Sequence, residues 1–405
     1  MRKINDVKEA MVLTNHVEPS AKPAWMAVVS LSAAIFGLVT AEFLPASLLT
    51  PISETLNVST GLVGQTVTAT AVVAGIAGPG VILGTKRFDR KFVLLCLTGL
   101  LIASSLISAY STSLGLLIFA RLLLGVGLGG FWAMSGALAM RLAPGKNMPR
   151  AMAIILTGVS LATVCAAPLG VYIGETLGWR SAFLMTAAVG FVTFIIQLFS
   201  VPSLPPVENS SLSSMADLLR RPVIRVGLIA TLFIVGGHFI GFTYIRPFLE
   251  SVPKLDVNSV SLVLLAYGIA GFFGNLFGGF VSGRSSKTSV IISASLIFVA
   301  AVAILLGGTE VQISAVFVAV WGFAFGAFPV SVQSYFTQLA PENRESIGAL
   351  VLTTFQIAIS LGAIAGGLLT DSIGAASIIW GLGIANALAV LAMLWRPRPR
   401  SSQPA

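Results

Sequence analysis

A single acid interrupts the first long apolar stretch of the chain. Glu42 lies in VTAEFLPASLLTP, residues 39–51, and it is the one charged residue of the run 24–49. Charged side chains inside such runs are energetically costly and usually functional. A carboxyl group there is either protonated and neutral, or ionised beside a cation, so it could bind and release a proton. We therefore predict that Glu42 takes part in proton coupling.

Arg121 is the candidate cation for Glu42. Each residue lies about seven positions from the expected outer end of its apolar run, 24–49 for Glu42 and 114–140 for Arg121. At about 1.5 Å per helical residue, the two side chains would lie at a similar depth. Either Arg121 or a proton could then neutralise Glu42. The alternative to a role in proton exchange is a permanent ion pair between Glu42 and Arg121 that is only structural.

A third group of polar side chains occurs in GGHFIGFTYIRPF, residues 236–248. His238 is close to the middle of its apolar run and could titrate near neutral pH, the alternative being a neutral, hydrogen-bonded histidine. Arg246 is near the expected outer surface and could extend its guanidinium group to it. We predict proton coupling through Glu42, Arg121 and His238.

Aromatic and amide side chains in other apolar runs are candidate ligand contacts. Trp132 and Trp321 could stack on a flat heteroaromatic ligand, or simply pack against helices and lipid. Gln333, Gln356 and Asn275 could bind a polar ligand, or only bond to neighbouring helices. The predicted substrate-binding residues are Trp132, Tyr244, Gln333 and Gln356.

The composition indicates that these side chains are positioned by membrane-spanning helices. Of the 405 residues, 56% are hydrophobic and 10% are charged, against about a quarter charged in soluble proteins. A helix needs about 20 apolar residues to cross a bilayer. Twelve runs meet this requirement and predict an all-α membrane protein: 24–49, 62–84, 92–111, 114–140, 151–173, 181–201, 223–249, 259–283, 288–308, 311–337, 347–370 and 376–395.

The cations predict the orientation of these spans. With the N-terminus inside, the cytoplasmic segments hold 20 of the 24 Lys and Arg residues, which places both termini in the cytoplasm. The net charge of +9 then reflects topology and contact with anionic membrane lipid, and we expect no nucleic-acid partner.

Internal similarity predicts two pseudo-symmetric six-helix halves. GVGLG at 125–129 returns as GFAFG at 322–326, and Pro45 is matched by Pro247. Small residues spaced by four, as in these glycine pairs, let helices approach closely. The polar stretch 203–222 separates the two sets of spans. The predicted parts are a cytoplasmic tail (1–23), two halves (24–202 and 223–395), a cytoplasmic linker (203–222) and a second tail (396–405).

Motifs for catalysis and for cofactors are absent from the sequence. GVGLGG at 125–130 fits a dinucleotide fingerprint, but it lies within an apolar span and not between a strand and a helix. Cys96 and Cys165 read as small packing residues, and no metal-ligand spacing occurs. We predict that the protein is not an enzyme and that it binds neither a cofactor nor a metal ion. An intramembrane enzyme or a receptor would need a set of catalytic residues or a soluble output domain, and the sequence offers neither.

The chain resembles the major facilitator superfamily, in its drug:proton antiporter branch. The resemblance is carried by Glu42 with Pro45, Arg121 with the glycines after it, APLG at 167–170 and GWRSAF at 178–183. It implies alternating access around a cavity lined by the first, fourth, seventh and tenth spans. GTKRFDRK at 84–91 is similar to the family's gating motif, with Lys86 and Asp89 departing from it. This implies a gating loop of Asp89, Arg90 and Lys91.

Longer stretches resemble bacterial purine ribonucleoside efflux pumps. They are EFLPASLLTPIS (42–53), GQTVTATA (64–71), GGFWAMSGALAMRLAP (129–144), FTYIRP (242–247) and LVLLAYGIA (262–270). This resemblance implies a monomer in the bacterial inner membrane that exports purine ribonucleosides such as inosine and guanosine in exchange for protons. A sugar or multidrug exporter of the same superfamily is the alternative.

Overall fold

The computed structural model describes residues 23–85, 87–144, 147–205, 217–341 and 343–395. All regular elements within these ranges are helices. Most of the predicted linker, nearly all of the N-terminal tail, the C-terminal tail and Lys86 lie outside the described residues.

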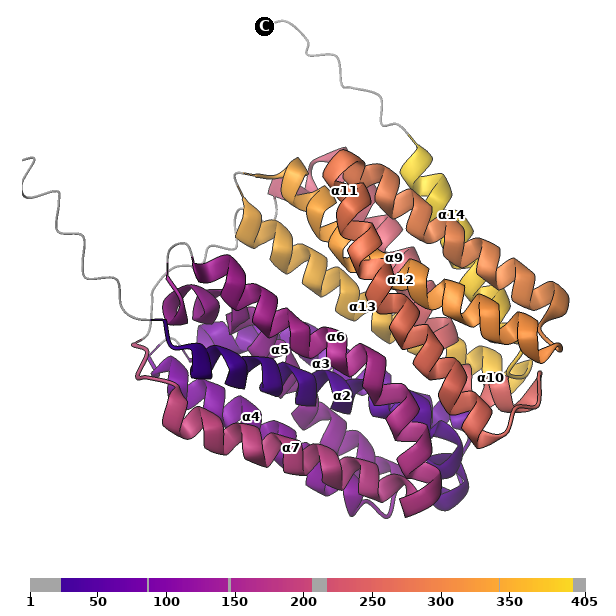
Figure 1. The fold of residues 1–405 in the computed structure, drawn as a ribbon, viewed down its shortest axis with the longest axis horizontal. Helices are drawn as coiled ribbons and strands as arrows, with labels where there is room; N and C mark the ends of the chain where they lie inside the picture. The colour runs from indigo at the N-terminus through magenta and orange to yellow at the C-terminus, as the bar shows by residue number, and fades with distance from the viewer. Residues whose placement is uncertain (1–22, 86, 145–146, 206–216, 342, 396–405) are drawn as a thin grey trace, which may run out of the picture.

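Six long helices form the first group, which runs from indigo to magenta in Figure 1. Serine and aspartate N-caps begin three of them, through bonds from Leu62 N–H to Ser59, from Lys91 N–H to Asp89 and from Leu116 N–H to Ser113. A short π-helix, η2 (Gly174–Gly178), connects the last two. The six helices are α2 (Trp25–Leu56), α3 (Thr60–Gly84), α4 (Arg90–Ala109), α5 (Leu114–Leu142), α6 (Met148–Ile173) and α7 (Trp179–Ser200).

The second group, rose to yellow in Figure 1, differs from the predicted spans in one place. The span predicted at 223–249 is interrupted between α9 and the short α10. The spans predicted at 259–283 and 288–308 are both helical and meet within α11 at a kink, where Ser285 has non-helical angles (φ −157°, ψ 104°). The helices are α9 (Pro222–Phe242), α10 (Ile245–Ser251), α11 (Val257–Gly307), α12 (Val311–Leu339), α13 (Arg344–Ser372) and α14 (Ser377–Leu394).

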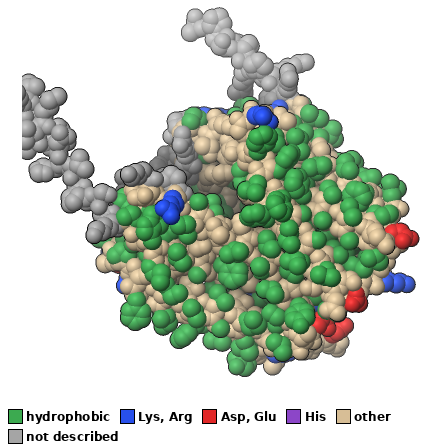
Figure 2. Space-filling view, viewed as in Figure 1, with side chains coloured by type: hydrophobic (Ala, Val, Ile, Leu, Met, Phe, Trp, Pro, Cys, Tyr) green, Lys and Arg blue, Asp and Glu red, His purple; other side chains and the backbone are tan. Residues whose placement is uncertain are grey.

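Within the described residues, ten helical stretches are long and apolar enough to cross a membrane. Large apolar side chains cover the face shown in Figure 2, as expected of a surface in contact with lipid. These findings confirm an all-helical, multi-pass membrane protein. Two of the ten stretches have 51 residues each, so the count of twelve spans stays a prediction.

Glycines bring pairs of helices into backbone contact. A Cβ atom built at Gly326 of α12 would lie 2.0 Å from the carbonyl oxygen of Gly271 in α11, and one at Gly129 of α5 would lie 2.2 Å from that of Ala74 in α3. Only a residue without a side chain fits at such distances. The close approach predicted for the glycines of GVGLG and GFAFG is therefore confirmed at Gly129 and Gly326, whereas Gly283 of α11 has no atom within 4 Å of a built Cβ.

Candidate functional site

Glu42 is buried in α2, just before a proline that interrupts the hydrogen bonds of the helix. The residue is 8% exposed, and no described residue donates a hydrogen bond to its carboxyl group or pairs with it as a cation. Pro45 has no N–H, so the carbonyl oxygen of Ala41, four residues earlier, lacks its helical donor. A buried acid and an open backbone acceptor therefore lie next to each other in α2.

Arg121 of α5 takes that open acceptor. It is fully buried, and its Nη1 donates to the carbonyl oxygen of Ala41 at 2.9 Å, while Nη2 donates to the hydroxyl of Ser108 at 2.5 Å. The guanidinium carbon lies 5.0 Å from the centre of the Phe183 ring, within cation–π range. Arg121 thus reaches the backbone beside Glu42, but the expected ion pair is not formed in this conformation.

His238 of α9 lies in a cluster of aromatic rings. It is 2% exposed, and Trp321 Nε1 donates a hydrogen bond to its Nδ1 at 3.1 Å. The imidazole stacks on Phe325, with 3.4 Å between ring centres, and on Phe242, with 5.1 Å. Because Nδ1 accepts this bond, it carries no proton here, which favours the neutral histidine among the two alternatives.

Replacing Trp321 with phenylalanine should change the tautomeric state of His238 and destabilise the protein beyond the effect of the smaller side-chain volume. The substitution leaves the buried Nδ1 atom without a donor, at an expected cost of about 1–3 kcal/mol. The ¹⁵N NMR signals of the imidazole should shift, because the tautomer is no longer fixed. Trp132→Phe is the control, since its indole has no hydrogen bond to a described residue. Unchanged imidazole signals in Trp321→Phe would contradict the assignment.

Tyr244 and Gln356, two predicted substrate contacts, both lie against α3. Tyr244 is fully buried. Its hydroxyl donates to the carbonyl oxygen of Ala363 at 2.8 Å and, at 3.4 Å, to the carbonyl oxygen of Gly61. It therefore joins helices in this conformation and contacts no open space. Gln356 is 5% exposed, faces Gly75 and has an Oε1 atom with no partner among the described residues.

The other two predicted substrate contacts, Trp132 and Gln333, are not connected to Tyr244 or Gln356. Trp132 is partly buried in α5, where its carbonyl accepts a bond from Ser135, and Gln333 is exposed on α12. Neither side chain has a hydrogen bond to a described residue. The four residues thus do not form one connected set in this conformation.

The predicted gating loop anchors the start of α4. Asp89 accepts hydrogen bonds from the backbone N–H of Lys91 at 2.7 Å, from that of Leu204 at 2.9 Å and from the hydroxyl of Ser203. Burial disfavours the charge of Asp89, but the bonds from Ser203 and the backbone outweigh it and hold the pKa of this carboxyl below its ordinary value. The loop therefore fastens the chain after α7 to the beginning of α4.

Other contacts at this end also stay within the first group. Arg90 Nη1 donates to the Thr85 hydroxyl at 2.9 Å, and Arg141 Nη1 donates to the Pro205 carbonyl at 2.7 Å. Figure 2 shows the surface hollowed between the two groups of helices on this side. We call this side, from which α2 and α4 begin, the open end.

At the opposite end, polar contacts join the two groups. The carboxylate of Asp371, in α13, accepts from the Ser59 hydroxyl at 2.6 Å and from the Gly61 N–H at 3.0 Å, both at the start of α3. Ser261 of α11 donates to the Pro168 carbonyl of α6 at 3.0 Å. We call this side the closed end.

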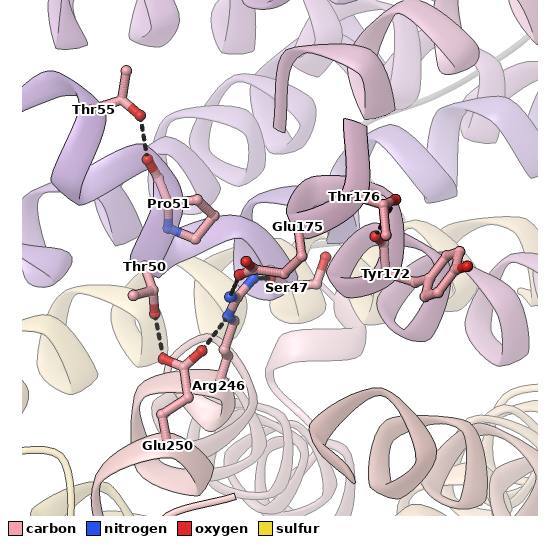
Figure 3. Close-up of polar contacts among 9 residues, drawn as sticks. All are labelled: Ser47, Thr50, Pro51, Thr55, Tyr172, Glu175, Thr176, Arg246 and Glu250. Atoms are coloured by element: carbon pink, nitrogen blue, oxygen red, sulfur yellow. Dashed lines mark hydrogen bonds and ion pairs between the residues drawn. The ribbon is translucent and has the colours of Figure 1, made fainter. Parts of the chain in front are cut away.

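A second set of closed-end contacts surrounds Arg246 of α10, as Figure 3 shows. Its guanidinium group bonds to Glu175 of η2, to Glu250 of α10 and to the Ser47 carbonyl of α2. The Thr50 hydroxyl donates to the other oxygen of Glu250 at 2.6 Å. Arg246 is thus held from both groups, and it does not extend to the surface as the sequence suggested.

A bundle of apolar helices with buried ionisable side chains, closed between its two groups at one end and hollowed at the other, defines a multi-pass membrane transporter. The chain belongs to the major facilitator superfamily, since the family model described as Major Facilitator Superfamily matches residues 29–344 and 247–405.

The relatives agree with this assignment. The purine ribonucleoside efflux pump NepI of Salmonella paratyphi B is 37% identical over 375 residues, which cover 92% of this chain and 94% of that protein. The NepI protein of Salmonella enteritidis PT4 is 37% identical over 354 residues, covering 87% of this chain and 89% of that protein.

Solved structures support the fold alone, because their identities are low. A bacterial homologue of the human lysosomal transporter Spinster, inward-facing and unoccupied, matches with a TM-score of 0.75 and 15% identity, over 92% of this chain and 95% of that one. A D-xylose-proton symporter also matches with a TM-score of 0.75 and 15% identity, over 92% and 97% of the two chains.

Proposed function

We propose that this protein exports purine ribonucleosides such as inosine and guanosine across the bacterial inner membrane in exchange for protons. The observation that carries the proton coupling is the buried Glu42 carboxyl, which has no partner among the described residues and lies beside an arginine bound to backbone. The substrate class comes from relatives that carry the name purine ribonucleoside efflux pump and match most of this chain.

We further propose twelve spans arranged as two halves, 24–202 and 223–395, joined by the linker 203–222 and flanked by the tails 1–23 and 396–405. Each 51-residue stretch would be about 75 Å long as one straight helix at 1.5 Å per residue, which is more than twice the thickness of the hydrocarbon core. Each contains a break, at η2 in one and at Ser285 in the other. Counting each as two crossings gives six per group.

The orientation follows from the charges at the open end. Cations lie in a turn at this end or in the helix ends and the α11 kink beside it, namely Arg87, Arg90, Arg141, Arg284 and Lys287. Cations gather on the cytoplasmic side of membrane proteins. The open end then faces the cytoplasm, as do both termini, and the conformation is inward-facing. A nucleoside would enter from the cytoplasm and leave after the closed end opens, from a protein that acts as a monomer.

Glu42, Arg121 and His238 form the proposed coupling set. When Glu42 is ionised, the guanidinium group of Arg121 can leave the Ala41 carbonyl and neutralise the carboxylate. A proton on Glu42 lets Arg121 return to the backbone, as in the present conformation. A proton on His238 Nδ1 would break its bond with Trp321, so the histidine adds a second site that responds to protonation.

The remaining roles concern the substrate and the open end. Trp132, Gln333 and Gln356 are the proposed substrate contacts, and Gln356 offers an unused amide oxygen. Tyr244 would join them only after α3 and α13 separate. Asp89, Arg90 and Lys91 would control the open end, through their attachment of α4 to the chain after α7.

Transport into inverted membrane vesicles tests the function. Vesicles with an acidic interior should accumulate radiolabelled inosine, and those without a pH gradient should only equilibrate it. Equal uptake under both conditions would argue against antiport. Competition by lipophilic cations or by sugars, with no competition by guanosine, would favour the alternative substrate classes.

A further inference from the structure

Among the described residues, Arg246 is the one buried cation that the proposed coupling set does not use. Its side chain is 1% exposed, and each guanidinium nitrogen has an acceptor. Nε donates to Glu250 Oε1 at 2.6 Å, Nη1 donates to the Ser47 carbonyl at 2.9 Å, and Nη2 donates to Glu175 Oε1. Because every guanidinium nitrogen has an acceptor, the orientation of the Arg246 side chain is fixed.

The acceptor on α2 exists because of a second proline. Pro51 has no N–H, so the Ser47 carbonyl four residues earlier has no helical donor. The arrangement repeats that of Pro45, whose open carbonyl binds Arg121. The difference is that Arg121 belongs to the same group as α2, whereas Arg246 belongs to the other group. The Arg246 bond therefore crosses between the two groups.

Glu175 supplies the charged bond that crosses between the groups. It lies in η2, which approaches α2 so closely that a Cβ atom at Gly174 would be 2.4 Å from Leu48 Cδ2. Glu250, in contrast, shares α10 with Arg246 and can follow it in any movement of the second group. Opening the closed end must therefore separate Arg246 from Glu175 and from Ser47, while Arg246 keeps Glu250.

The two carboxylates are open to water on the closed side, although the arginine is not. The side chain of Glu175 is 37% exposed and that of Glu250 is 24% exposed. Among the described residues, the groups of α2 that bond to this cluster are the Thr50 hydroxyl and the Ser47 carbonyl, both neutral. A proton from that side can thus reach Glu175 without passing through the bundle.

We propose that Arg246 and Glu175 are a proton-released latch for the closed end. Protonation of Glu175 removes its negative charge, and the ion pair with Arg246 is lost. The guanidinium group, still bound to Glu250, then leaves the Ser47 carbonyl. Water on the closed side thereby controls when that side opens. The inference rests on the proposed function in one respect, namely that the closed end opens during transport.

Distances between spin labels at Tyr110 and Leu306 test the latch. Both residues are exposed, lie at the closed end in different groups and take no part in the polar contacts described. The labels would be placed in full-length protein in lipid nanodiscs, with Cys96 and Cys165 replaced by alanine, and measured without substrate. Acidic buffer should increase the fraction of long distances in the otherwise unchanged protein.

Glu175→Gln should show this long-distance state already at neutral pH. We expect the ratio of open to closed molecules to rise about tenfold, as for the loss of one charged hydrogen bond, and to respond little to pH. Glu54→Gln is the matched control, because Glu54 is an exposed acid of α2 at the same end without a polar contact to a described residue. It should behave as the unchanged protein does.

Thr50→Val separates the role of the proton from that of contact alone. It removes the neutral bond to Glu250, so it should raise the long-distance fraction and keep the pH response. The latch is overturned if Glu175→Gln has the same distances and the same pH response as the unchanged protein, or if Thr50→Val loses that response. Because no substrate is present, failure of inosine transport would refute the proposed function and leave this result intact.

Discussion

Glu42→Gln should abolish the accumulation of nucleoside against its gradient. Glutamine keeps the size and the hydrogen-bonding atoms of the side chain, but it cannot take up a proton under these conditions. A difference of one pH unit across the membrane is equivalent to about 1.4 kcal/mol per proton. Exchange of one proton for one nucleoside can therefore sustain a nucleoside gradient of up to about tenfold for each pH unit. In the variant, we expect the nucleoside only to equilibrate, as measured with labelled inosine in inverted vesicles.

Two further measurements make this result specific. Glu54→Gln removes an exposed acid from the same helix and should leave accumulation unchanged. Exchange of labelled for unlabelled inosine without a pH gradient should continue in Glu42→Gln, because that exchange needs no net proton movement. Full accumulation by Glu42→Gln would show that another group couples the proton.

Gly326→Ala should cause a large loss of stability for so small a substitution. The added Cβ would lie 2.0 Å from the Gly271 oxygen and 2.6 Å from its carbonyl carbon, and these are backbone atoms that cannot rotate away. Overpacking of this kind typically costs about 1–3 kcal/mol, which corresponds to a fall of roughly 2–10 °C in the melting temperature. Thermal unfolding in detergent or nanodiscs measures it.

Gly283→Ala is the control, because it makes the same chemical change at the end of the same packed region. A Cβ there meets no atom within 4 Å, and alanine favours the helix over glycine by about 1 kcal/mol. Its melting temperature should be unchanged or higher. If both variants melted alike, close packing of α11 on α12 would not limit the stability of the protein.

Hydrophobic length predicted where the helices lie, but it predicted only one of the two breaks in the second group. The run 223–249 is apolar throughout, yet α9 ends at Phe242 because Pro247 cannot donate to the Thr243 carbonyl and its ring crowds that position. The polar residues around Ser285, in contrast, predicted a break between two spans, and the chain has a kink there at a single non-helical residue. Hydropathy does not record the break before Pro247, since that break depends on individual backbone hydrogen bonds.

The depth argument predicted Arg121 at the level of Glu42, but it did not identify the backbone acceptor of its guanidinium group. That acceptor follows from Pro45, which the sequence shows and which also supports the internal similarity and the family resemblance. The same reasoning applied to Pro51 could have found an acceptor for Arg246. Glu175 could not have been found in this way, because it is 71 positions from Arg246 and only the packing of η2 against α2 brings them together.

The burial of Glu42 also has an electrical consequence. If one proton enters for each uncharged nucleoside that leaves, every cycle carries one positive charge inward. Moving that charge across the membrane gains about 2.3 kcal/mol for each 100 mV of potential, negative inside. A cell in neutral surroundings, with no difference in acidity across its envelope, could therefore still expel nucleosides by using its resting voltage.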